Sequence, residues 1–387
     1  MKAKSTPSSQ LSMASITTQF MGANIRGLCQ SPATPTTLKN FQQTRRRKIL
    51  LVQATSSARA NNSLSFCEGE RERPHWTGDT PASRFVATLT TIPPLYNLMK
   101  FGARQVLIST AEKNGIAWRE MAREILASEV YKEKEDIENP SVIYPDYYLK
   151  PFHAYKQGNL SWEAAAEVEA ATMSMCRRAI PSAASLEEAT QIVRGNWLQA
   201  IEDHHIQNSG GLAITDILDV GCSVGVSTRF LADKFPCADV MGLDLSPYFL
   251  AVAEYKEKLR PSREKPIKWI HANGEETGLP SALFDIISLA FVIHECPQCA
   301  IRGLLKEAYR LLRPGGTVAL TDNSPKSKII QNLSPVLFTL MKSTEPHLDE
   351  YFLLNLEDAM QEIGFVNVQS ILTDPRHRTV TASVPTL

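Results

Sequence analysis

The stretch LDVGCSVGVSTRFLA, residues 218–232, is compatible with two fold classes, and the choice between them decides the fold. Its Gly221-x-Ser223-x-Gly225 pattern is that of a hydrolase nucleophile elbow, in which Ser223 would attack the substrate. The same residues also describe a glycine-rich turn between a strand and a helix, shaped to receive a nucleoside ligand. Because the two interpretations imply unrelated chemistry, the rest of the chain must decide between them.

Downstream of residue 210, short apolar runs alternate with amphipathic stretches, which predicts a doubly wound α/β sheet with right-handed crossovers. The predicted strands are 216–220, 239–244, 267–271, 284–290, 316–322, 366–372 and 379–384. The predicted helices are 227–234, 247–259, 300–312 and 356–363. Gly364 is placed to stop the last of these helices. Because no helix separates the last two strands, we expect them to form an antiparallel hairpin at one edge.

Upstream, residues 85–209 are expected to form a helical extension. Apolar residues from Trp118 to Ile125 recur at helical spacing, and Ser161 is placed to cap a second helix. The glycine-rich turn therefore follows the first strand of the sheet. A nucleophile elbow normally lies in the middle of a sheet, after strands that supply the oxyanion hole, and no His-Gly-Gly motif precedes this one. The pattern therefore favours the ligand-binding turn over the hydrolase.

The N-terminal segment has the composition of a targeting peptide. Residues 1–67 contain nine Lys or Arg, 18 Ser or Thr and no acidic residue. The first 25 residues lack arginine, and LVQA at 51–54 is similar to a stromal cleavage site. We therefore expect a chloroplast transit peptide over 1–54, with a mitochondrial leader and a disordered basic tail as the alternatives. Residues 55–84 are expected to be a linker, and the protein to lie in the stroma or on plastid membranes or plastoglobules.

The charge of the remaining chain argues against a nucleic-acid partner. Beyond residue 67 there are 32 basic and 41 acidic residues, a net charge of −9, whereas nucleic-acid-binding surfaces are basic. Outside the leader the longest uncharged run, 85–99, is 15 residues long and interrupted by two prolines, so no transmembrane helix is expected. The seven cysteines are scattered, and CPQC (296–299) lacks a second ligand pair, so the sequence predicts free thiols and no metal site.

The position of Asp244 relative to the turn indicates the kind of ligand. Asp244 lies 19 residues after Gly225 and ends the second predicted strand, where it can accept hydrogen bonds from two ribose hydroxyls. The dinucleotide fingerprint is absent, because Ser223 and Thr228 stand where glycines are needed. The pattern predicts a nucleoside ligand without a pyrophosphate.

Four stretches together resemble a known family. They are LDVGCSVGVST (218–228), VMGLDLSPYFLAVA (240–253), ANGEETGLPSALFDIISLAFVIHE (272–295) and EAYRLLRPGGTVALTD (307–322). In this order they are similar to the motifs of class I S-adenosylmethionine-dependent methyltransferases, most of all to the branch that includes the ubiquinone and menaquinone C-methyltransferases. The resemblance covers about residues 210–385 and implies S-adenosylmethionine as cofactor, with a seven-stranded Rossmann-like domain over 210–387. The upstream helices are similar to an extension in a plant and cyanobacterial subgroup.

Carried over by position, the resemblance assigns cofactor contacts to ten residues: Asp219, Gly221, Ser223, Gly225, Asp244, Leu245, Asn273, Gly274, Ala290 and Phe291. Asp219 would lie near the cofactor's amino group, Asp244 would bind the ribose and Leu245 would pack on the adenine. Asn273 replaces the family's Asp at the adenine amino group, and Gly274 replaces a common Ala, a change expected to be neutral. Alternatively, the glycines serve only a tight turn and Asp244 caps the following helix.

The sequence motifs indicate catalytic and acceptor-binding residues less clearly than cofactor-binding residues. His294 lies just past the fourth strand, where a neutral imidazole would take a proton from a phenol, a thiol or a ring carbon beside a phenol; otherwise it hydrogen-bonds a local turn. Its neighbour Glu295 is expected to be a helix first-turn residue. The other candidates are Tyr147, Tyr148, His153 and Tyr155, as a lid or as packing, and His347.

The stretch AFVIHECP (290–297) indicates the acceptor class. It lacks the Asn/Asp-Pro-Pro-Tyr/Phe pattern of enzymes that methylate amino groups of nucleobases, and it is similar to small-molecule O- and C-methyltransferases. We expect a small apolar or aromatic metabolite such as a quinone, pigment or phenolic. The alternatives are a protein or RNA methyltransferase and a non-catalytic cofactor-binding protein whose acceptor side is plugged by Phe291 or Tyr148.

Overall fold

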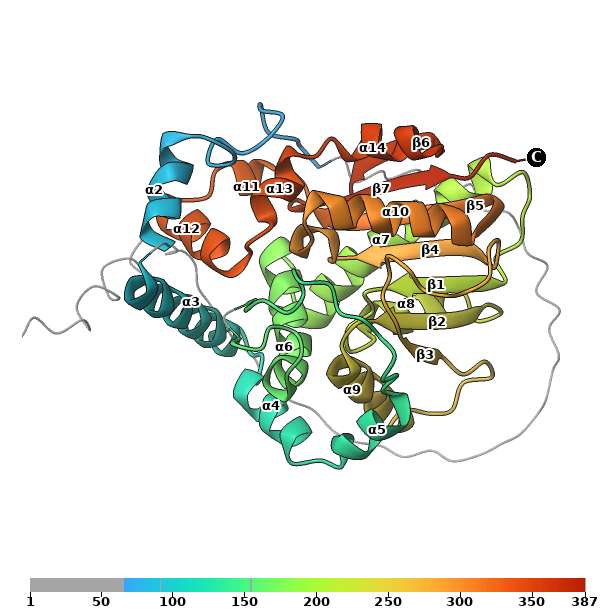
Figure 1. The fold of residues 1–387 in the computed structure, drawn as a ribbon, viewed down its shortest axis with the longest axis horizontal. Helices are drawn as coiled ribbons and strands as arrows, with labels where there is room; N and C mark the ends of the chain where they lie inside the picture. The colour runs from blue at the N-terminus through green and yellow to red at the C-terminus, as the bar shows by residue number, and fades with distance from the viewer. Residues whose placement is uncertain (1–65, 91, 154, 387) are drawn as a thin grey trace, which may run out of the picture. The chain divides into compact units, whose positions relative to one another are not determined.

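The computed structural model of the chain describes residues 66–90, 92–153 and 155–386, and it is built on a seven-stranded sheet. The strands are β1 (Asp216–Val220), β2 (Asp239–Asp244), β3 (Lys268–His271), β4 (Phe284–Ala290), β5 (Leu312–Asn323), β6 (Val366–Leu372) and β7 (His377–Ser383). They lie in the order β3-β2-β1-β4-β5-β7-β6 (Figure 1). Strands β1 to β5 are parallel, whereas β7 is antiparallel to both β5 and β6. The predicted doubly wound sheet and its reversed hairpin are confirmed.

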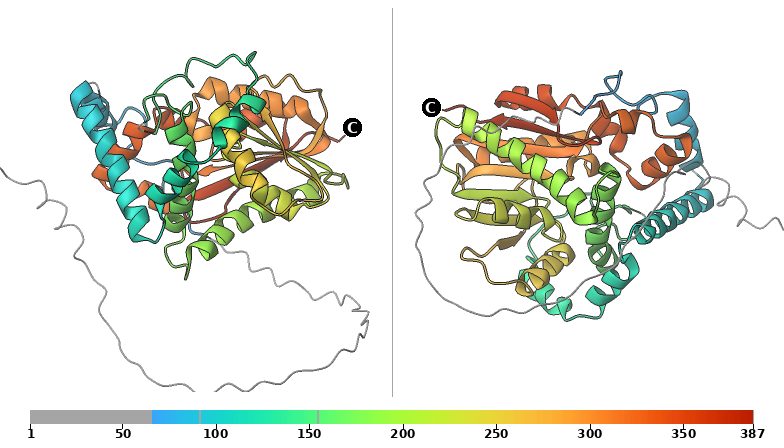
Figure 2. Two further views of the ribbon diagram at one scale, coloured as in Figure 1. Left: turned by 90° about the horizontal axis from the view of Figure 1, so that it is seen from below. Right: turned by 180° about the vertical axis from the view of Figure 1, so that it is seen from behind.

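Alternating side chains of the central strands form two separate cores. Leu218 and Ile287 pack with α10 (Gln298–Leu311) on one face of the sheet. Ile217 and Ile286 pack on the other face, which α7 (Leu186–Asn208) and α8 (Val226–Lys234) cover (Figure 2). Strand β4 is buried along its whole length, as expected for a parallel strand covered on both faces. This alternation sets the direction of each site residue on β1.

The remaining crossovers contain both expected and unexpected helices. The expected ones are α9 (Pro247–Lys258) and α14 (Leu356–Ile363), which ends at Gly364 in the left-handed conformation. Three short helices between β5 and α14 were not expected: α11 (Lys328–Gln331), α12 (Pro335–Thr344) and α13 (Leu348–Leu353). Ser327 and Ser334 cap the first two of these through their side chains.

The extension consists of helices joined by loops, as predicted, and the connection before α6 covers residues 138–161. It comprises α2 (Pro81–Thr90), α3 (Pro93–Lys113), α4 (Trp118–Leu126), α5 (Val130–Ile137), α6 (Trp162–Ala179) and α7. The Ser161 hydroxyl accepts a hydrogen bond from the Ala164 amide at 3.2 Å and caps α6. Figure 1 shows α3, α4 and α6 at one end of the sheet. Among the described residues, no helix combines the length and apolar character needed to cross a bilayer.

The predicted linker is wrong over its described part, residues 66–84. Trp76 is completely buried, and its ring stacks on Phe338 at 5.5 Å and meets Phe352 edge-on at 5.7 Å. Its Nε1 donates a hydrogen bond to the Ile330 carbonyl at 3.3 Å. The contacts of Trp76 thus hold the polar, proline-containing segment 66–84 against helices α11–α13. The predicted transit peptide and residues 55–65 lie outside the described residues.

Candidate functional site

A cavity of ≈ 590 Å³ lies at the carboxyl ends of β1, β2 and β4. The turns after these strands form one wall. The opposite wall is formed by α3 and α6 of the extension and by α12 of the crossover between β5 and α14. This edge is where doubly wound sheets bind their ligands. The cavity therefore lies between the carboxyl edge of the sheet and helices α3, α6 and α12.

The glycine-rich turn approaches its neighbours too closely for side chains. Gly221 and Gly225 have φ values of 69° and 77°. A Cβ would lie 2.6 Å from Val292 Cγ2 at Gly221 and 2.4 Å from Trp269 Cη2 at Gly225. The Gly221 amide also donates to the Leu243 carbonyl at 2.8 Å, which fixes the turn between β1 and β2. The backbone conformation and the close neighbours therefore require glycine at both positions.

Ser223 is not placed for nucleophilic attack. It adopts a φ of 52°, a left-handed conformation that is costly for a residue with a side chain. Its hydroxyl is buried and has no hydrogen-bond partner among the described residues, so no histidine activates it. Its amide donates to Asp244 Oδ2 at 2.7 Å. The hydrolase interpretation therefore lacks its general base.

Asp244 presents a buried carboxylate to the cavity. The Ser246 amide donates to its Oδ1 at 2.7 Å, and the side chain is only 6% exposed. Burial raises the pKa of Asp244 to about 7, against the stabilising amide donors. The alternative role as a helix cap is wrong, because the Ser246 hydroxyl accepts the Phe249 amide and caps α9. Each carboxylate oxygen retains a lone pair for a ligand hydroxyl.

Asp219 does not line the cavity, in contrast to the prediction. It is completely buried on the face of β1 that α8 covers, and its Oδ2 accepts hydrogen bonds from Ser227 at 2.6 Å and Thr228 at 2.7 Å. Burial raises its pKa to about 6, although these hydroxyl donors oppose the shift. Asp219 therefore fixes the start of α8, while its Oδ1 has no partner among the described residues.

Arg194 on α7 lines the cavity and was not predicted. It is 3% exposed, and its Nε and Nη1 have no hydrogen-bond partner among the described residues. The guanidinium lies over the Phe291 ring at 5.0 Å, and burial lowers its pKa. Two buried guanidinium nitrogens without hydrogen-bond partners are costly and suit a carboxylate ligand. The sequence did contain a signal for this residue: Arg194 lies on the apolar face of the helix, in line with Trp197 at i+3 and Ile201 at i+7.

The remaining predicted cofactor residues line the cavity: Leu245, Asn273, Gly274, Ala290 and Phe291. Asn273 Oδ1 accepts the Glu275 amide at 3.0 Å. The expectation that Ala is neutral at position 274 is wrong, because a Cβ there would lie 2.7 Å from Val220 Cγ1 and 2.8 Å from Leu304 Cδ2. Gly274 is needed for close packing of the loop after β3 against α10.

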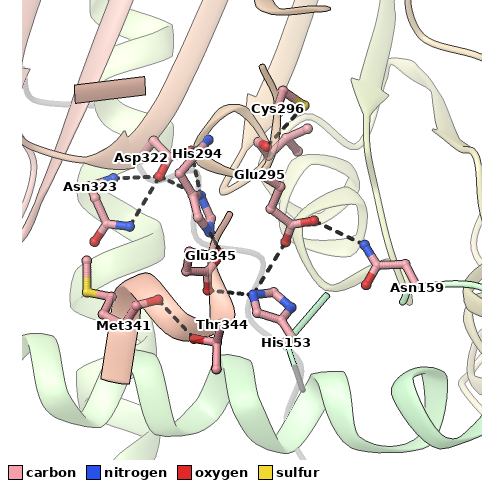
Figure 3. Close-up of polar contacts among 11 residues, drawn as sticks. His153, Asn159, His294, Glu295, Cys296, Asp322, Asn323, Met341, Thr344 and Glu345 are labelled. Atoms are coloured by element: carbon pink, nitrogen blue, oxygen red, sulfur yellow. Dashed lines mark hydrogen bonds and ion pairs between the residues drawn. The ribbon is translucent and has the colours of Figure 1, made fainter. Parts of the chain in front are cut away.

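A polar cluster occupies another part of the same cavity (Figure 3). His294, in the 3₁₀ turn η1 (Ile293–Glu295), contacts Asp322 Oδ1 through its Nδ1 at 2.8 Å. His153 Nε2 lies 2.7 Å from Glu345 Oε1 and 3.9 Å from Glu295 Oε1. These groups come from the connection before α6, from η1, and from the ends of β5 and α12. Only the tertiary fold brings them together.

The surroundings of His294 favour its protonated form in the free protein, so the predicted role as a neutral base stays a prediction. Burial on its own lowers the pKa of this imidazole, but Asp322, Glu345 and Glu295 outweigh it and raise the pKa to about 10. The pKa of His153 is also raised, because Glu345 and Glu295 outweigh its burial. The carboxylates of the cluster therefore attract positive charge into the cavity.

Three tyrosines of the connection, Tyr147, Tyr148 and Tyr155, line the cavity, as His153 does, but the hydroxyls of two have structural partners. Tyr147 donates to Glu275 at 2.8 Å and Tyr155 donates to Glu167 at 2.6 Å, whereas Tyr148 lines the wall without a comparable bond. His347 is not among the lining residues; its Nδ1 lies 3.1 Å from Glu350. In the CPQC stretch both cysteines are free thiols.

Comparison with known proteins adds an independent line of information. Residues 218–320 match a family described as a methyltransferase domain. The chain is 28% identical to a demethylmenaquinone methyltransferase of Lactococcus lactis over 40% of its own length and 59% of the relative's, and so spans less than two thirds of that enzyme. It is 31% identical to the demethylmenaquinone methyltransferase of Tropheryma whipplei over 44% of its length and 73% of the relative's. A solved phosphoethanolamine N-methyltransferase 2 of Haemonchus contortus with S-adenosyl-L-methionine is similar at 20% identity and a TM-score of 0.37, covering 49% of this chain and 53% of that one.

Proposed function

The chain belongs to the class I S-adenosylmethionine-dependent methyltransferases, in the branch that includes the quinone C-methyltransferases, and on this premise we propose that it methylates a small aromatic or apolar metabolite at carbon or oxygen. The proposal rests on one cavity that combines a region suited to the cofactor with a region suited to the acceptor. Unpaired polar atoms lie beside the glycine-rich turn, and a His–Glu cluster faces them across mainly apolar walls. The names of the relatives support an aromatic acceptor.

The unpaired groups match the polar parts of the cofactor. S-adenosylmethionine has a carboxylate, an amino group and two ribose hydroxyls, and bound here it supplies a methyl group on a positively charged sulfur. Arg194 offers unpaired donors to the carboxylate, and Asp244 offers lone pairs to the ribose. Ser223 lines the cavity with a buried hydroxyl oxygen that has no partner among the described residues. Each group lacks something that this ligand provides.

The chain's own contribution to methyl transfer is positioning and the exclusion of water. In-line displacement needs donor and acceptor held at a fixed distance in a dry site. Apolar residues of the three opposing helices, among them Leu107, Val168 and Met341, line the cavity and suit an aromatic or apolar acceptor. Phe291 and Tyr148 lie in the wall and leave the cavity open, which supports catalysis over a plugged cofactor-binding protein.

We also propose that the protein works in the chloroplast, on the composition of its first 54 residues. A fusion of residues 1–67 to a fluorescent protein is expected to enter plastids. Import into mitochondria, or a diffuse signal, would contradict this proposal.

A labelling survey tests the function. The purified chain is mixed with plastid extract and methyl-labelled S-adenosylmethionine, and the products are divided into organic-soluble, protein and RNA fractions. We expect label in the organic phase, absent with an Asp244→Ala variant. Label confined to protein or RNA would contradict the small-molecule acceptor, and no label despite cofactor binding would contradict catalysis.

Replacing Arg194 with methionine is expected to weaken S-adenosylhomocysteine binding about 10- to 100-fold, because the cofactor's carboxylate loses its charged partner. Stability should not fall, since the variant removes an unpaired buried charge. The control is 5′-methylthioadenosine, which lacks the carboxylate and the amino group. In calorimetric titration, the variant should bind this ligand as tightly as the wild type does. Equal losses for both ligands would show that Arg194 acts only through the fold.

The raised pKa of Asp244 predicts that nucleoside binding weakens in acid. With a pKa of about 7, Asp244 is mainly ionised at pH 8 and mainly protonated at pH 6. The affinity for 5′-methylthioadenosine, which has no amino acid group to titrate, should fall about tenfold between these values. Ionised Asp244 also destabilises the free protein, so this cost is present above pH 7 and disappears as the pH falls below it. Asp244→Asn should bind weakly at every pH, and a wild-type affinity that is constant from pH 6 to 8 would contradict the assignment.

A further inference from the structure

Three side chains from distant parts of the chain converge on one point in the cavity (Figure 3). They are His153 from the connection before α6, His294 from η1, and Glu345 directly after α12. One ligand atom from each lies within 4.8 Å of the other two. His153 Nε2 is 2.7 Å from Glu345 Oε1, and His294 Nε2 is 3.9 Å from Glu345 Oε2. Two imidazoles and one carboxylate thus point toward a common centre.

The spacing suits a tetrahedral metal ion. Zinc binds histidine nitrogen and carboxylate oxygen at about 2.0–2.2 Å, so its ligand atoms lie roughly 3.3–3.5 Å from one another. The two Nε2 atoms lie 2.7 and 3.9 Å from different oxygens of Glu345, and one ligand atom from each residue lies within 4.8 Å of the others, so side-chain rotations would bring the three atoms to this spacing. Two histidines and one glutamate are a ligand set of catalytic zinc sites, which leave the fourth position for water or substrate.

A neighbouring residue orients one of the three side chains by a hydrogen bond, as the partners of metal ligands commonly do. His294 Nδ1 hydrogen-bonds Asp322, which is 1% exposed, so the ring is oriented with Nε2 toward Glu345. This carboxylate–histidine arrangement fixes the tautomer that presents Nε2 to a metal. Glu345 Oε2 is buried and has no hydrogen-bond partner among the described residues. An acceptor oxygen that lacks a donor is therefore aimed into the cluster.

Charge and backbone strain also favour a cation. Glu295, Glu345 and Asp322 bring three carboxylates around the two imidazoles, and this excess of acidic groups favours a cation at their centre. His153 is held at a φ of 47°, in the left-handed region, although it is not glycine. Such conformations persist where the surrounding structure or a ligand requires them.

We propose that His153, His294 and Glu345 bind one Zn²⁺ ion, with the open coordination position facing the acceptor part of the cavity. There the ion would take an oxygen of the acceptor, which narrows the substrate class to molecules with a hydroxyl or carbonyl group on the reacting ring. This role toward the acceptor rests on the proposed function, whereas the metal site itself does not. The site is separate from the CPQC stretch, on which the expectation of no metal was based.

Metal titration of the full chain tests the site without any methyl transfer. The protein is stripped with EDTA, and Zn²⁺ is added in competition with a chromophoric chelator. We expect one tight site in the wild type, an affinity at least 100-fold lower in His294→Gln and Glu345→Gln, and a 10- to 100-fold loss in Asp322→Asn. Co²⁺ in place of zinc should give the intense visible absorption of a tetrahedral site.

Two comparisons separate metal binding from folding and from cofactor binding. His347→Gln is the matched control, because its imidazole also pairs with a glutamate, Glu350, but lies outside the cluster; it should bind Zn²⁺ like the wild type. Each variant is also titrated with S-adenosylhomocysteine, and retained affinity shows an intact fold. Absence of a stoichiometric wild-type site, or Zn²⁺ binding undiminished in the ligand variants, would overturn the metal site. Failure to bind S-adenosylhomocysteine would instead overturn the proposed function.

Discussion

Replacing Asp244 with alanine is expected to weaken S-adenosylmethionine binding by about 100-fold or more. The reason is that a charged carboxylate loses its hydrogen bonds to two ribose hydroxyls, each of which contributes about 1.5–3 kcal/mol. The side chain lies at the end of β2, lines the cavity and is 6% exposed, so water replaces it poorly. Calorimetric titration measures the change.

The same substitution is also expected to lower the free energy of unfolding. Asp244 accepts the amides of Ser223 and Ser246, both at 2.7 Å, and the variant leaves these donors unpaired. The two unpaired donors should cost about 2–4 kcal/mol below pH 7, and above pH 7 the removal of the buried ionised carboxylate offsets part of this cost, so binding must be measured where the variant is folded. Asp239→Ala is the matched control, since this aspartate begins the same strand but pairs with Lys265 at the surface. Wild-type affinity in Asp244→Ala would remove the cofactor assignment.

Replacing Gly225 with alanine is expected to destabilise the protein by about 2–5 kcal/mol and to abolish cofactor binding. About 1–2 kcal/mol comes from holding alanine at a φ of 77°, and the rest from the new Cβ, which would lie 2.4 Å from Trp269 Cη2 and 2.9 Å from Arg229 Nη1. Trp269 lies on β3, two strands away from β1 in the sheet, and the clash with its ring would force the turn out of its position. Chemical denaturation and calorimetric titration measure the two effects.

Gly278→Ala separates backbone strain from the steric clash. Gly278 has a φ of 72°, close to that of Gly225, but an added Cβ meets nothing within 4 Å. This variant should lose only about 1–2 kcal/mol and should bind S-adenosylhomocysteine normally. Equal losses at the two positions would show that the contact with Trp269 is unimportant.

The sheet was predictable because its strands carry strong local patterns. Strands β1, β2, β4 and β6 match the expected bounds, and Gly221, Gly225 and Asp244 follow directly from their places at strand ends. The direction of Asp219 was missed, although strand alternation places it on the same face as Ile217, toward α8. Element positions therefore follow from local pattern, while side-chain direction needs the strand's register.

The features missed depend on contacts between distant segments. The burial of Trp76 against Phe338 spans more than 250 residues, and helices α11–α13 are too short for a clear apolar repeat. The cluster of His153, His294 and Glu345 joins three segments, none of which shows metal-ligand spacing in the sequence. The raised pKa of His294 likewise arises from Asp322 and Glu345, which no local pattern places beside it.

The most direct test of the account is a crystal structure of the chain with S-adenosylhomocysteine. The account predicts the ribose hydroxyls on Asp244, the amino acid carboxylate at Arg194, and the sulfur directed toward the part of the cavity that contains His294 and Glu345. A ligand bound outside this cavity, or one that leaves Asp244 without a ribose contact, would contradict it.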